Sequence, residues 1–490
     1  MTELTKLNFV ELNMEVLSKT AGRVAVCVTA SGKMDAIAKN VDRLMQGGLT
    51  RLIDSPKFAK MKIPHVETFV WPKGMTADAL DILFVPNKPT ALDLREAGAE
   101  LVKRKGEDRL TVLWGNRRWG EELALGILLR DYSFDPHKTK DTKTRGAVSI
   151  QLSKTELAKV DLVTLEALAT GVIVTRDLVN EPANHLTTDE FSHRLSALSK
   201  FGIKVEILEE KDLAELGMHM LLSVGKGSVS NSKVVVMRWQ GATKKDAPMA
   251  LVGKGVVFDT GGISLKRAEG MEEMTMDMGG AAVVAGVMCA LAKRRAHANV
   301  VGVVGLVENM PSGEATRPGD VVTSLKGDTV EIINTDAEGR LVLGDIMWYT
   351  QERFSPVGMI DLATLTGAII VSLGHSNAGV FSNHDQFCNA FLKASAEEGE
   401  GAWRMPLGND YDKLLKSRVA DMKNVGGRDA GAISAAQFLQ RFVRDDCPWI
   451  HLDIAGVALV KAGTKFAPAG ATGWGVLAIN KLIHQKYERN

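Results

Sequence analysis

The second half of the chain contains a series of short apolar runs with few charged residues. Three of them are "KVVVMRW" (233–239), "MALVGKGVVF" (249–258) and "NVVGVVGLVEN" (299–309). A strand that is buried on both faces is apolar almost throughout, whereas a half-buried strand alternates apolar and polar residues. Helical patterns lie between several of these runs, and this order is typical of a mostly parallel sheet covered by helices. Further strand-like runs are 204–208, 329–334, 358–365 and 449–456.

The first 152 residues show the same alternation of strand and helix patterns. Apolar runs such as "RVAVCVTA" (23–30) and "ALDILFV" (79–85) alternate with amphipathic segments such as 93–105. We therefore predict an N-terminal α/β domain over residues 1–152.

One long helical pattern covers residues 153–180 and ends at "NEPAN", where Pro182 is a stop signal. The chain has 490 residues, which is too long for one ordinary core. We therefore predict a linker helix over 153–180 and a C-terminal α/β domain with a mostly parallel central sheet over 181–490.

The charge and cysteine content exclude several classes of protein. The formal net charge is +1, so there is no electrostatic case for nucleic acid or an anionic membrane as the main partner. The four cysteines are far apart and form no CxxC pair, which argues against a thiolate zinc site and a disulfide framework.

The N-terminal segment and the apolar stretches of the sequence argue against secretion and membrane insertion. The N-terminus lacks a basic segment followed by an apolar run. No apolar stretch reaches the roughly 20 residues that span a bilayer, and "AAVVAGVMCALA" (281–292) is predicted to be a buried helix. We therefore expect a cytoplasmic protein.

Acidic residues stand where predicted strands end. Asp259 ends the strand before "TGG", and Asp277 precedes two glycines and a helix. Asp336 and Glu338 follow the run 329–334 and precede another helix. Open α/β sheets bind ligands at the carboxyl ends of their strands, so these four side chains are candidates for one site.

The segment "NTDAEGRL" (334–341) places two of these acids and an arginine at alternate positions. If the chain is extended there, Asp336, Glu338 and Arg340 leave it on the same side. The carboxylates would repel one another unless a cation lies between them. Four acids carry about four negative charges, which two divalent cations would balance, and such a pair can activate water and polarise a carbonyl group.

The residues alone leave other interpretations open. An aspartate after a strand is more often a helix cap or a turn former, and Asp277 is compatible with that. Lys254 and Lys266 could be ordinary surface lysines, and Arg340 could simply pair with Asp336. His451 in "WIHLDIAG" is more typical of a packed residue than of a ligand. The sequence contains no HExxH, GxSxG or Walker motif.

Several ordered motifs resemble the M17 leucyl aminopeptidase (cytosol aminopeptidase) family. "NTDAEGR" is the signature of that family, and the resemblance covers most of residues 176–476. The other matching motifs are "VGKGVVFDTGGISLK" (252–266), "MTMDMGGAA" (274–282), "DLATLTGA" (361–368), "GGRDAGAISAAQFLQRFV" (426–443) and "WIHLDIAGVA" (449–458).

The resemblance implies a site for two divalent metal ions, Mn²⁺ or Zn²⁺, and a macro-like N-terminal domain. By motif position, the five residues that would bind the metals are Lys254, Asp259, Asp277, Asp336 and Glu338. In the family the tighter metal corresponds to Lys254, Asp259, Asp277 and Glu338, and the more exchangeable one to Asp259, Asp336, Glu338 and the Asp336 carbonyl. A lysine can bind a metal only as the neutral amine, so a nearby dication must lower its pKa.

The resemblance also implies two catalytic residues and a mechanism. A metal-bridging water would attack the peptide carbonyl, and Lys266 would polarise that carbonyl and stabilise the oxyanion. Arg340 would hold a bicarbonate ion that carries a proton from the water to the leaving amine. The substrate would be a peptide with a free N-terminus, preferably leucine.

The family's specificity pocket corresponds to small or apolar residues here, whose alternative interpretation is ordinary core. These residues are Met274, Thr364, Leu365, Gly367, Ala455 and Ala458. The resemblance further implies a homohexamer with the catalytic domains inside.

Two other functions are kept as alternatives. Some bacterial members of the family also bind DNA in a regulatory role, although the net charge near zero argues against strong binding here. Two metals would also permit phosphoester hydrolysis, but the sequence has no obvious phosphate-binding loop.

Overall fold

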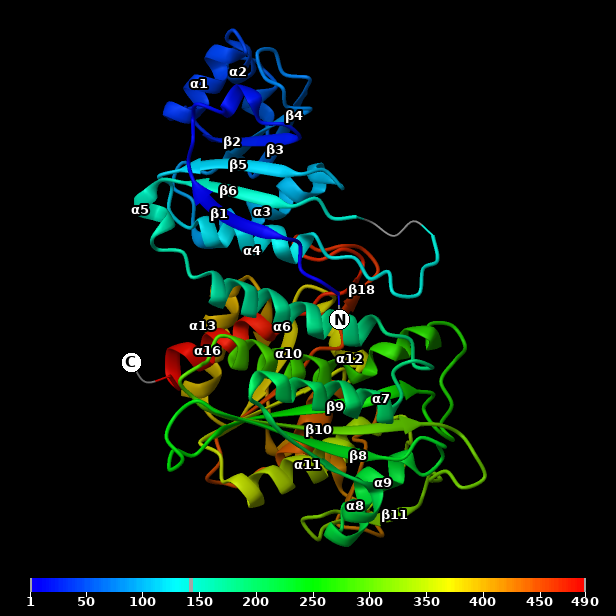
Figure 1. Ribbon diagram of the computed structural model, residues 1–490. Coiled ribbons are helices and arrows are strands. Elements are labelled where there is room, and N and C mark those ends of the chain that lie inside the picture. The colour runs from blue at the N-terminus through cyan, green and yellow to red at the C-terminus, as the bar shows by residue number, and fades with distance from the viewer. Residues whose placement is uncertain (1, 141–143, 489–490) are drawn as a thin grey trace. The chain divides into compact units, whose positions relative to one another are not determined.

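The computed structural model describes residues 2–140 and 144–488 (Figure 1). The chain divides into two compact units. The first unit contains the residues up to Ala169 together with Gly463–Pro468. The second contains Thr170–Ala462 and the residues from Ala469 onward.

The first unit is built on a six-stranded sheet in the order β1-β6-β5-β2-β4-β3. All neighbouring strands are parallel except β3, which runs antiparallel to β4. Helices α1 and α2 cover one face, and α3 and α4 cover the other (Figure 1). The bounds are β1 Leu7–Glu11, β2 Arg23–Thr29, β3 His65–Val70, β4 Ala79–Val85, β5 Leu110–Gly115, β6 Val148–Leu152, α1 Ala36–Leu44, α2 Gly48–Ile53, α3 Ala91–Lys105 and α4 Gly120–Arg130.

The single helix expected over 153–180 is divided into two helices. These are α5 (Lys154–Leu157) and α6 (Leu162–Asn180). Ser153 accepts a hydrogen bond from the backbone N–H of Glu156, and Asp161 accepts one from Thr164. Asp161 therefore acts as a second N-cap inside the helical pattern and starts a new helix.

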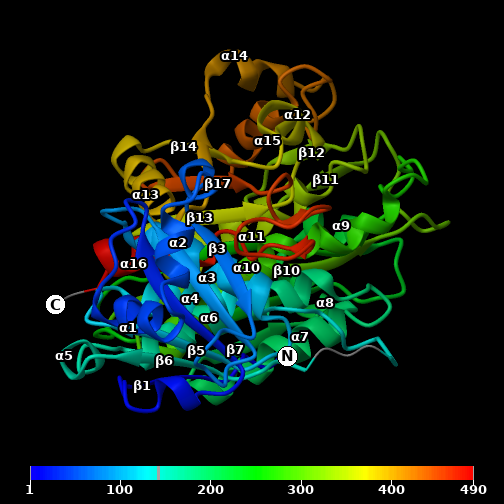
Figure 2. The same cartoon turned by 90° about the horizontal axis from the view of Figure 1, so that it is seen from above.

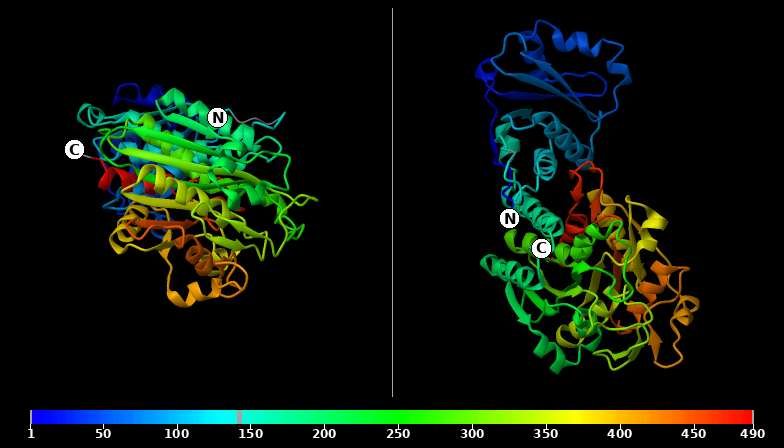
Figure 3. Two further views of the ribbon diagram at one scale, coloured as in Figure 1. Left: turned by 90° about the horizontal axis from the view of Figure 1, so that it is seen from below. Right: turned by 90° about the vertical axis from the view of Figure 1, so that its right-hand side faces the viewer.

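The second unit contains an eight-stranded sheet in the order β15-β14-β17-β13-β9-β10-β8-β7. Its four central strands, β17, β13, β9 and β10, are all parallel. The predicted α/β fold with a mostly parallel central sheet is therefore confirmed. Strands β7 to β10 lie side by side in the view from below in Figure 3. The bounds are β7 Lys204–Leu208, β8 Lys233–Gln240, β9 Met249–Asp259, β10 Asn299–Asn309, β13 Gly358–Ala363, β14 Ala378–Ser382, β15 Ala402–Arg404 and β17 Trp449–Asp453.

Helices cover both faces of this sheet, as its apolar strands require. In Figure 1, α6, α10 and α16 lie on one face, and α9 and α11 lie on the other. Helices α12 and α15 lie side by side (Figure 2). The bounds are α7 Thr188–Ser196, α8 Glu210–Leu216, α9 His219–Gly225, α10 Gly279–Lys293, α11 Gly339–Phe354, α12 Gly367–Leu373, α13 Asp385–Glu398, α14 Asn409–Asp412, α15 Gly431–Gln440 and α16 Val476–Lys486.

Helix α10 is a buried core helix, as its apolar sequence predicts. Among the described residues, the stretch Met271–Lys293 is long and apolar enough to cross a membrane by length and composition alone. However, 83% of its most apolar window is buried inside the protein.

Two glycines let α10 approach the sheet closely. A Cβ atom on Gly280 would lie 2.0 Å from the carbonyl oxygen of Leu362 in β13. A Cβ atom on Gly253 in β9 would lie 2.7 Å from the Cα atom of Ala281. Larger side chains would push the helix away, so this close packing brings Asp277, just before α10, against Lys254 in β9.

Candidate metal centre

The acidic residues predicted from the sequence meet at the carboxyl ends of the central strands. Asp259 is the last residue of β9, and Asp277 lies in the short 3-10 helix η4 (Met271–Met278) before α10. Asp336 and Glu338 lie in the loop before α11. These residues line one cavity of about 540 Å³.

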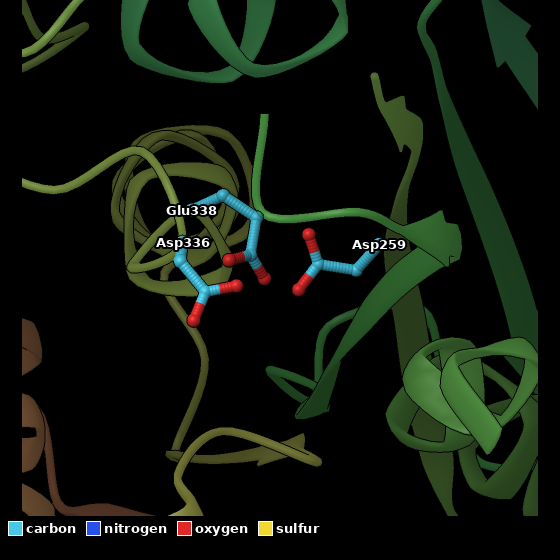
Figure 4. Close-up of side chains that lie close together, drawn as sticks. All are labelled: Asp259, Asp336 and Glu338. Carbon is cyan, nitrogen blue, oxygen red and sulfur yellow. The ribbon is translucent and has the colours of Figure 1, made fainter. Parts of the chain in front are cut away.

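Three carboxylates form a compact cluster. One oxygen each from Asp259, Asp336 and Glu338 lies within 4.8 Å of the others. The three side chains point toward one another (Figure 4). Asp259 and Glu338 are buried and Asp336 is half-buried, so water screens their repulsion only in part.

Lys254 is not a surface lysine but is buried between carboxylates. Its Nζ atom lies 2.7 Å from Asp277 Oδ1 and 2.7 Å from Glu338 Oε1. It also donates to the carbonyl oxygen of Thr364 at 3.2 Å. Burial lowers the pKa of Lys254, but Asp277 and Glu338 outweigh this effect and raise it above its ordinary value. Without a metal ion the side chain is therefore an ammonium group.

Lys266 lies on the other side of the cluster. Its Nζ atom is 2.7 Å from Asp259 Oδ2 and also pairs with Asp336. Burial lowers the pKa of Lys266, but the carboxylates, Asp259 above all, raise it beyond its ordinary range. Lys266 is therefore charged at neutral pH.

The two lysines do not balance the four carboxylates. Fully ionised, the six side chains leave two negative charges in a largely buried site, which is costly. Burial accordingly raises the pKa values of Asp259, Asp277 and Asp336. Asp277 Oδ2 is buried and accepts no hydrogen bond from any residue that the structure describes. A deficit of positive charge and a free carboxylate oxygen are what a divalent-cation site with oxygen ligands provides.

The segment "NTDAEGRL" is not extended, contrary to the condition considered from its sequence. Asp336 lies in a turn, Glu338 has helical backbone angles and Arg340 is already in α11. The strand expected over 329–334 stops at Glu331, in the small sheet β11 (Val321–Thr323), β12 (Thr329–Glu331) and β16 (Met422–Lys423). The turn, rather than strand alternation, gathers Asp336 and Glu338.

Arg340 does not serve as the ion-pair partner of Asp336 that its position suggested. Its Nη1 donates to the carbonyl oxygen of Asn424 at 2.7 Å, whereas Asp336 pairs with Lys266. Its Nε is buried and has no hydrogen-bond partner among the described residues. Burial lowers the pKa of Arg340 to about 10, which still leaves it charged at neutral pH.

Asn424 holds this loop in place, and no sequence pattern points to this residue. Its Oδ1 accepts from the backbone N–H groups of Ile333 (2.9 Å) and Asn334 (3.3 Å). Its Nδ2 donates to the carbonyl oxygens of Asn334 (2.7 Å) and Ala337 (3.3 Å). Asn424 therefore fixes both the loop backbone and, through its own carbonyl oxygen, Arg340.

Asn309 is a second residue that sequence reasoning missed. Its Nδ2 donates to Asp259 Oδ1 at 2.8 Å and to the carbonyl oxygen of Thr335 at 3.1 Å. A signal existed, because Asn309 ends the strand "NVVGVVGLVEN", and β10 pairs with β9 so that Asn309 faces Asp259. It orients one carboxylate of the cluster.

The residues predicted for a specificity pocket mostly line the same cavity. These are Met274, Thr364, Leu365, Gly367 and Ala455. Ala458 is absent from the cavity wall. Ala458 is buried beneath Gly279. A Cβ atom added to Gly279 would lie 3.4 Å from the Cβ atom of Ala458. Thr364 also donates to Asp277 Oδ1 at 2.8 Å, so the pocket wall and the acidic cluster share a residue.

Comparison with known sequences gives a consistent match. The catalytic domain of the cytosol aminopeptidase family matches residues 173–480. The chain is 56% identical to a probable cytosol aminopeptidase of Dinoroseobacter shibae and 54% identical to one of Cereibacter sphaeroides. Both alignments cover 100% of each chain.

Solved structures of the same size have the same fold. The bottromycin maturation enzyme BotP in complex with Mn superposes with a TM-score of 0.80 at 31% identity, covering 94% of this chain and 99% of that one. A mutant of tomato leucine aminopeptidase superposes with a TM-score of 0.86 at 28% identity, covering 98% of this chain and 97% of that one.

We predict that divalent metal stabilises this protein more as the pH rises. The pKa values of Asp259, Asp277 and Asp336 are raised in the folded protein. As the pH rises above about 4, the unfolded chain therefore loses these protons before the metal-free fold does, and the metal-free fold becomes less stable. A metal ion removes this penalty, and it must also displace the proton of Lys254, so its affinity grows about tenfold per pH unit for each proton released.

The measurement is the Tm at pH 5, 6 and 7.5 with excess Mn²⁺ and with a chelator. The difference between the two Tm values should increase with pH. A difference that stays constant from pH 5 to 7.5 would contradict the assignment of the cluster as a cation site.

Proposed function

Because the chain belongs to the cytosol aminopeptidase family and is therefore a metal-dependent aminopeptidase, we propose that it is a leucyl aminopeptidase. It removes N-terminal residues, preferably leucine, from peptides. The observation that carries this proposal is the buried acidic cluster with two lysines at the wall of an open cavity. Its excess negative charge suits two divalent cations, and the cavity gives a peptide access to them.

Two groups of side chains would hold the two metal ions. Lys254, Asp259, Asp277 and Glu338 form one group. Asp259, Asp336 and Glu338 form the other. In the absence of metal, the Lys254 ammonium already occupies a cation's place between Asp277 and Glu338. Bound there, two dications would activate water and polarise the peptide carbonyl.

Manganese and zinc are the metals we propose. Oxygen-rich sites accept several divalent ions, and availability decides among them. The relative BotP binds Mn in its solved structure, which favours manganese as the first metal to test.

Lys266 would supply positive charge to the substrate carbonyl. Its ammonium group lies at the cavity wall beside Asp259, within the site but only partly buried. An ammonium in this position stabilises the negative charge that develops on the carbonyl oxygen during attack. It also stays protonated, since the carboxylates raise its pKa.

Arg340 would hold a bicarbonate ion at the cavity. The support is its buried Nε, which has no hydrogen-bond partner among the described residues, and its fixed orientation through the Asn424 carbonyl. A guanidinium recognises planar oxyanions through paired N–H donors. Bicarbonate held there would supply proton transfer between water and the leaving amine.

The apolar surface of the cavity wall supports the proposed preference for leucine. Met274, Leu365 and Ala455 offer apolar surface, while Gly367 leaves space that a side chain can fill. Ala458 lies behind this wall and would act, if at all, through packing. The free amine of a peptide would be anchored by the tighter metal, so one residue is removed at a time.

We also propose the remaining features that the resemblance implies. The residues 1–152 form a macro-like domain, and 181–490 the catalytic domain, in a cytoplasmic homohexamer. Light scattering should then give six times the chain mass of 53.0 kDa, and a monomer mass would refute the assembly. DNA binding stays an alternative prediction, on which neither the site nor the comparisons bear.

The first test of the proposed function is metal-dependent hydrolysis of aminoacyl anilides. Leucine anilide should be cleaved with Mn²⁺ or Zn²⁺, lost on chelation and restored by adding metal back. Lys266→Ala should lower kcat by about 10²–10³-fold, since it removes a group that acts on the oxyanion. A folded, metal-loaded protein without activity on any anilide would refute the proposal.

The role of Arg340 has a separate test. Wild-type activity should rise when bicarbonate is added to carbonate-depleted buffer, because the ion provides proton transfer. Arg340→Ala should be slower and should not respond to bicarbonate. Lys266→Ala is the matched control, since it is slow but should keep the bicarbonate response. An Arg340→Ala variant that responds like the wild type would contradict the assignment.

A further inference from the structure

A buried polar network lies on strands β13 and β17, and no step of the proposed reaction uses it. Asp361, in β13, is fully buried and its Oδ1 lies 2.7 Å from His451 Nδ1. Its Oδ2 accepts from the indole N–H of Trp449 at 2.6 Å. His451 faces Asp361 across the parallel strand pair, and both side chains have no exposure to solvent.

Asp453 is on the same face of β17 as His451, since the two residues are two positions apart in a strand. It is also fully buried. No lysine or arginine pairs with it in the part of the chain that the structure describes. Burial raises the pKa of its carboxyl group, and His451 together with the hydrogen bonds from Thr366, Leu365 and Ala455 only partly opposes this.

The described hydrogen bonds to the Asp453 carboxylate come from the turn that follows β13 and from the end of its own strand. Its Oδ1 accepts from the backbone N–H groups of Leu365 (3.1 Å) and Thr366 (3.4 Å). Its Oδ2 accepts from Thr366 Oγ1 at 2.6 Å. The backbone N–H of Ala455 also donates to Oδ1, at 3.3 Å.

The same turn touches the acidic cluster at its other end. Thr364 accepts a hydrogen bond from Lys254 through its carbonyl oxygen and donates one to Asp277 through its hydroxyl group. All four residues of the turn, Thr364 to Gly367, line the cavity. A shift of this turn would therefore move the pocket wall and two side chains of the cluster together.

We propose that Asp453 is a positioning residue that fixes the Thr364–Gly367 turn between the acidic cluster and the side-chain pocket. This inference rests on the proposed aminopeptidase function. Asp453 touches neither substrate nor metal and acts through the turn. A buried carboxylate costs stability, and it fixes one backbone geometry through directional bonds that an apolar residue could not make.

The principal variant is Asp453→Asn, which keeps the shape of the side chain but removes its charge. A loosened turn should lower kcat/KM for leucine anilide by about 10–100-fold, since small displacements of binding groups are costly. It should also lower the ratio of kcat/KM between leucine anilide and alanine anilide, because the pocket wall is less well placed. That ratio does not depend on how much of the protein is folded.

Asp345→Asn is the matched control for loss of a buried carboxylate. Asp345, in α11, is also fully buried and accepts from the backbone N–H groups of Leu221 (3.0 Å) and Leu325 (2.8 Å). It lies outside the cavity wall. Its substitution should lower the Tm but leave the leucine-to-alanine ratio within about twofold.

Thr366 gives a second route that does not disturb the buried carboxylate itself. Thr366→Val removes the hydroxyl group that donates to Asp453 and also caps α12 by accepting from the backbone N–H of Ile369, whereas Thr366→Ser keeps both bonds. The valine variant should lower the leucine-to-alanine ratio, and the serine variant should restore it to near the wild-type value.

The outcomes separate this inference from the proposed function. Wild-type protein that cleaves neither anilide would overturn the proposed function, and the positioning role with it. Active wild type with a reduced ratio in Asp453→Asn and Thr366→Val, and an unchanged ratio in Asp345→Asn and Thr366→Ser, is the expected result. Active wild type with an unchanged ratio in both Asp453→Asn and Thr366→Val would overturn the positioning role alone.

Discussion

The repulsion among four carboxylates in a largely buried space is the constraint on which the rest of the site depends. Lys254 and Lys266 offset half of this negative charge, and the remainder requires protons or bound cations. A protein can hold such a cluster only if its backbone resists the repulsion. Hydrogen bonds from neighbouring elements help to hold two of the carboxylates, since Asn309 donates to Asp259 and Thr364 donates to Asp277.

The parallel sheet supplies the first part of this resistance. Its central strands end at one edge, so the residues that follow β9 and β13 meet there whatever the length of the connections between them. Close packing at Gly253 and Gly280 then sets the depth of α10, and with it the position of Asp277. The amide side chains of Asn309 and Asn424 further stabilise the backbone around the site, because they join segments that are distant in sequence. The site is thus rigid at several independent points.

Much of the fold could be predicted from the sequence because burial on both faces of a sheet leaves continuous apolar runs. Pro182 predicts the end of the helical pattern because proline is a local stop signal. The break at Asp161 was missed, since a capping residue inside a helical pattern has only a weak local signature. The run 329–334 was apolar enough to suggest a full strand, yet its second half serves the loop that Asn424 holds. Long-range hydrogen bonds of this kind leave no periodicity in the sequence.

For the site, strand-end position found Asp259, Asp277, Asp336 and Glu338, and motif resemblance was needed for Lys254 and Lys266, which resemble surface lysines in isolation. The structure brings all six together. Asn424 and Asp453 could not be found in this way, because their importance lies in what they contact rather than in their local pattern. Ala458 is the opposite case. Its motif position predicted a pocket residue, but the structure places it behind the cavity wall.

The most direct test of the account is a crystal structure of the protein soaked with Mn²⁺, with anomalous scattering used to locate the metal. We predict two anomalous peaks inside the cluster. One should lie among Lys254, Asp277 and Glu338, and the other beside Asp259 and Asp336. A fully soaked crystal in which both lysines still pair with these carboxylates and no anomalous peak lies among them would contradict it.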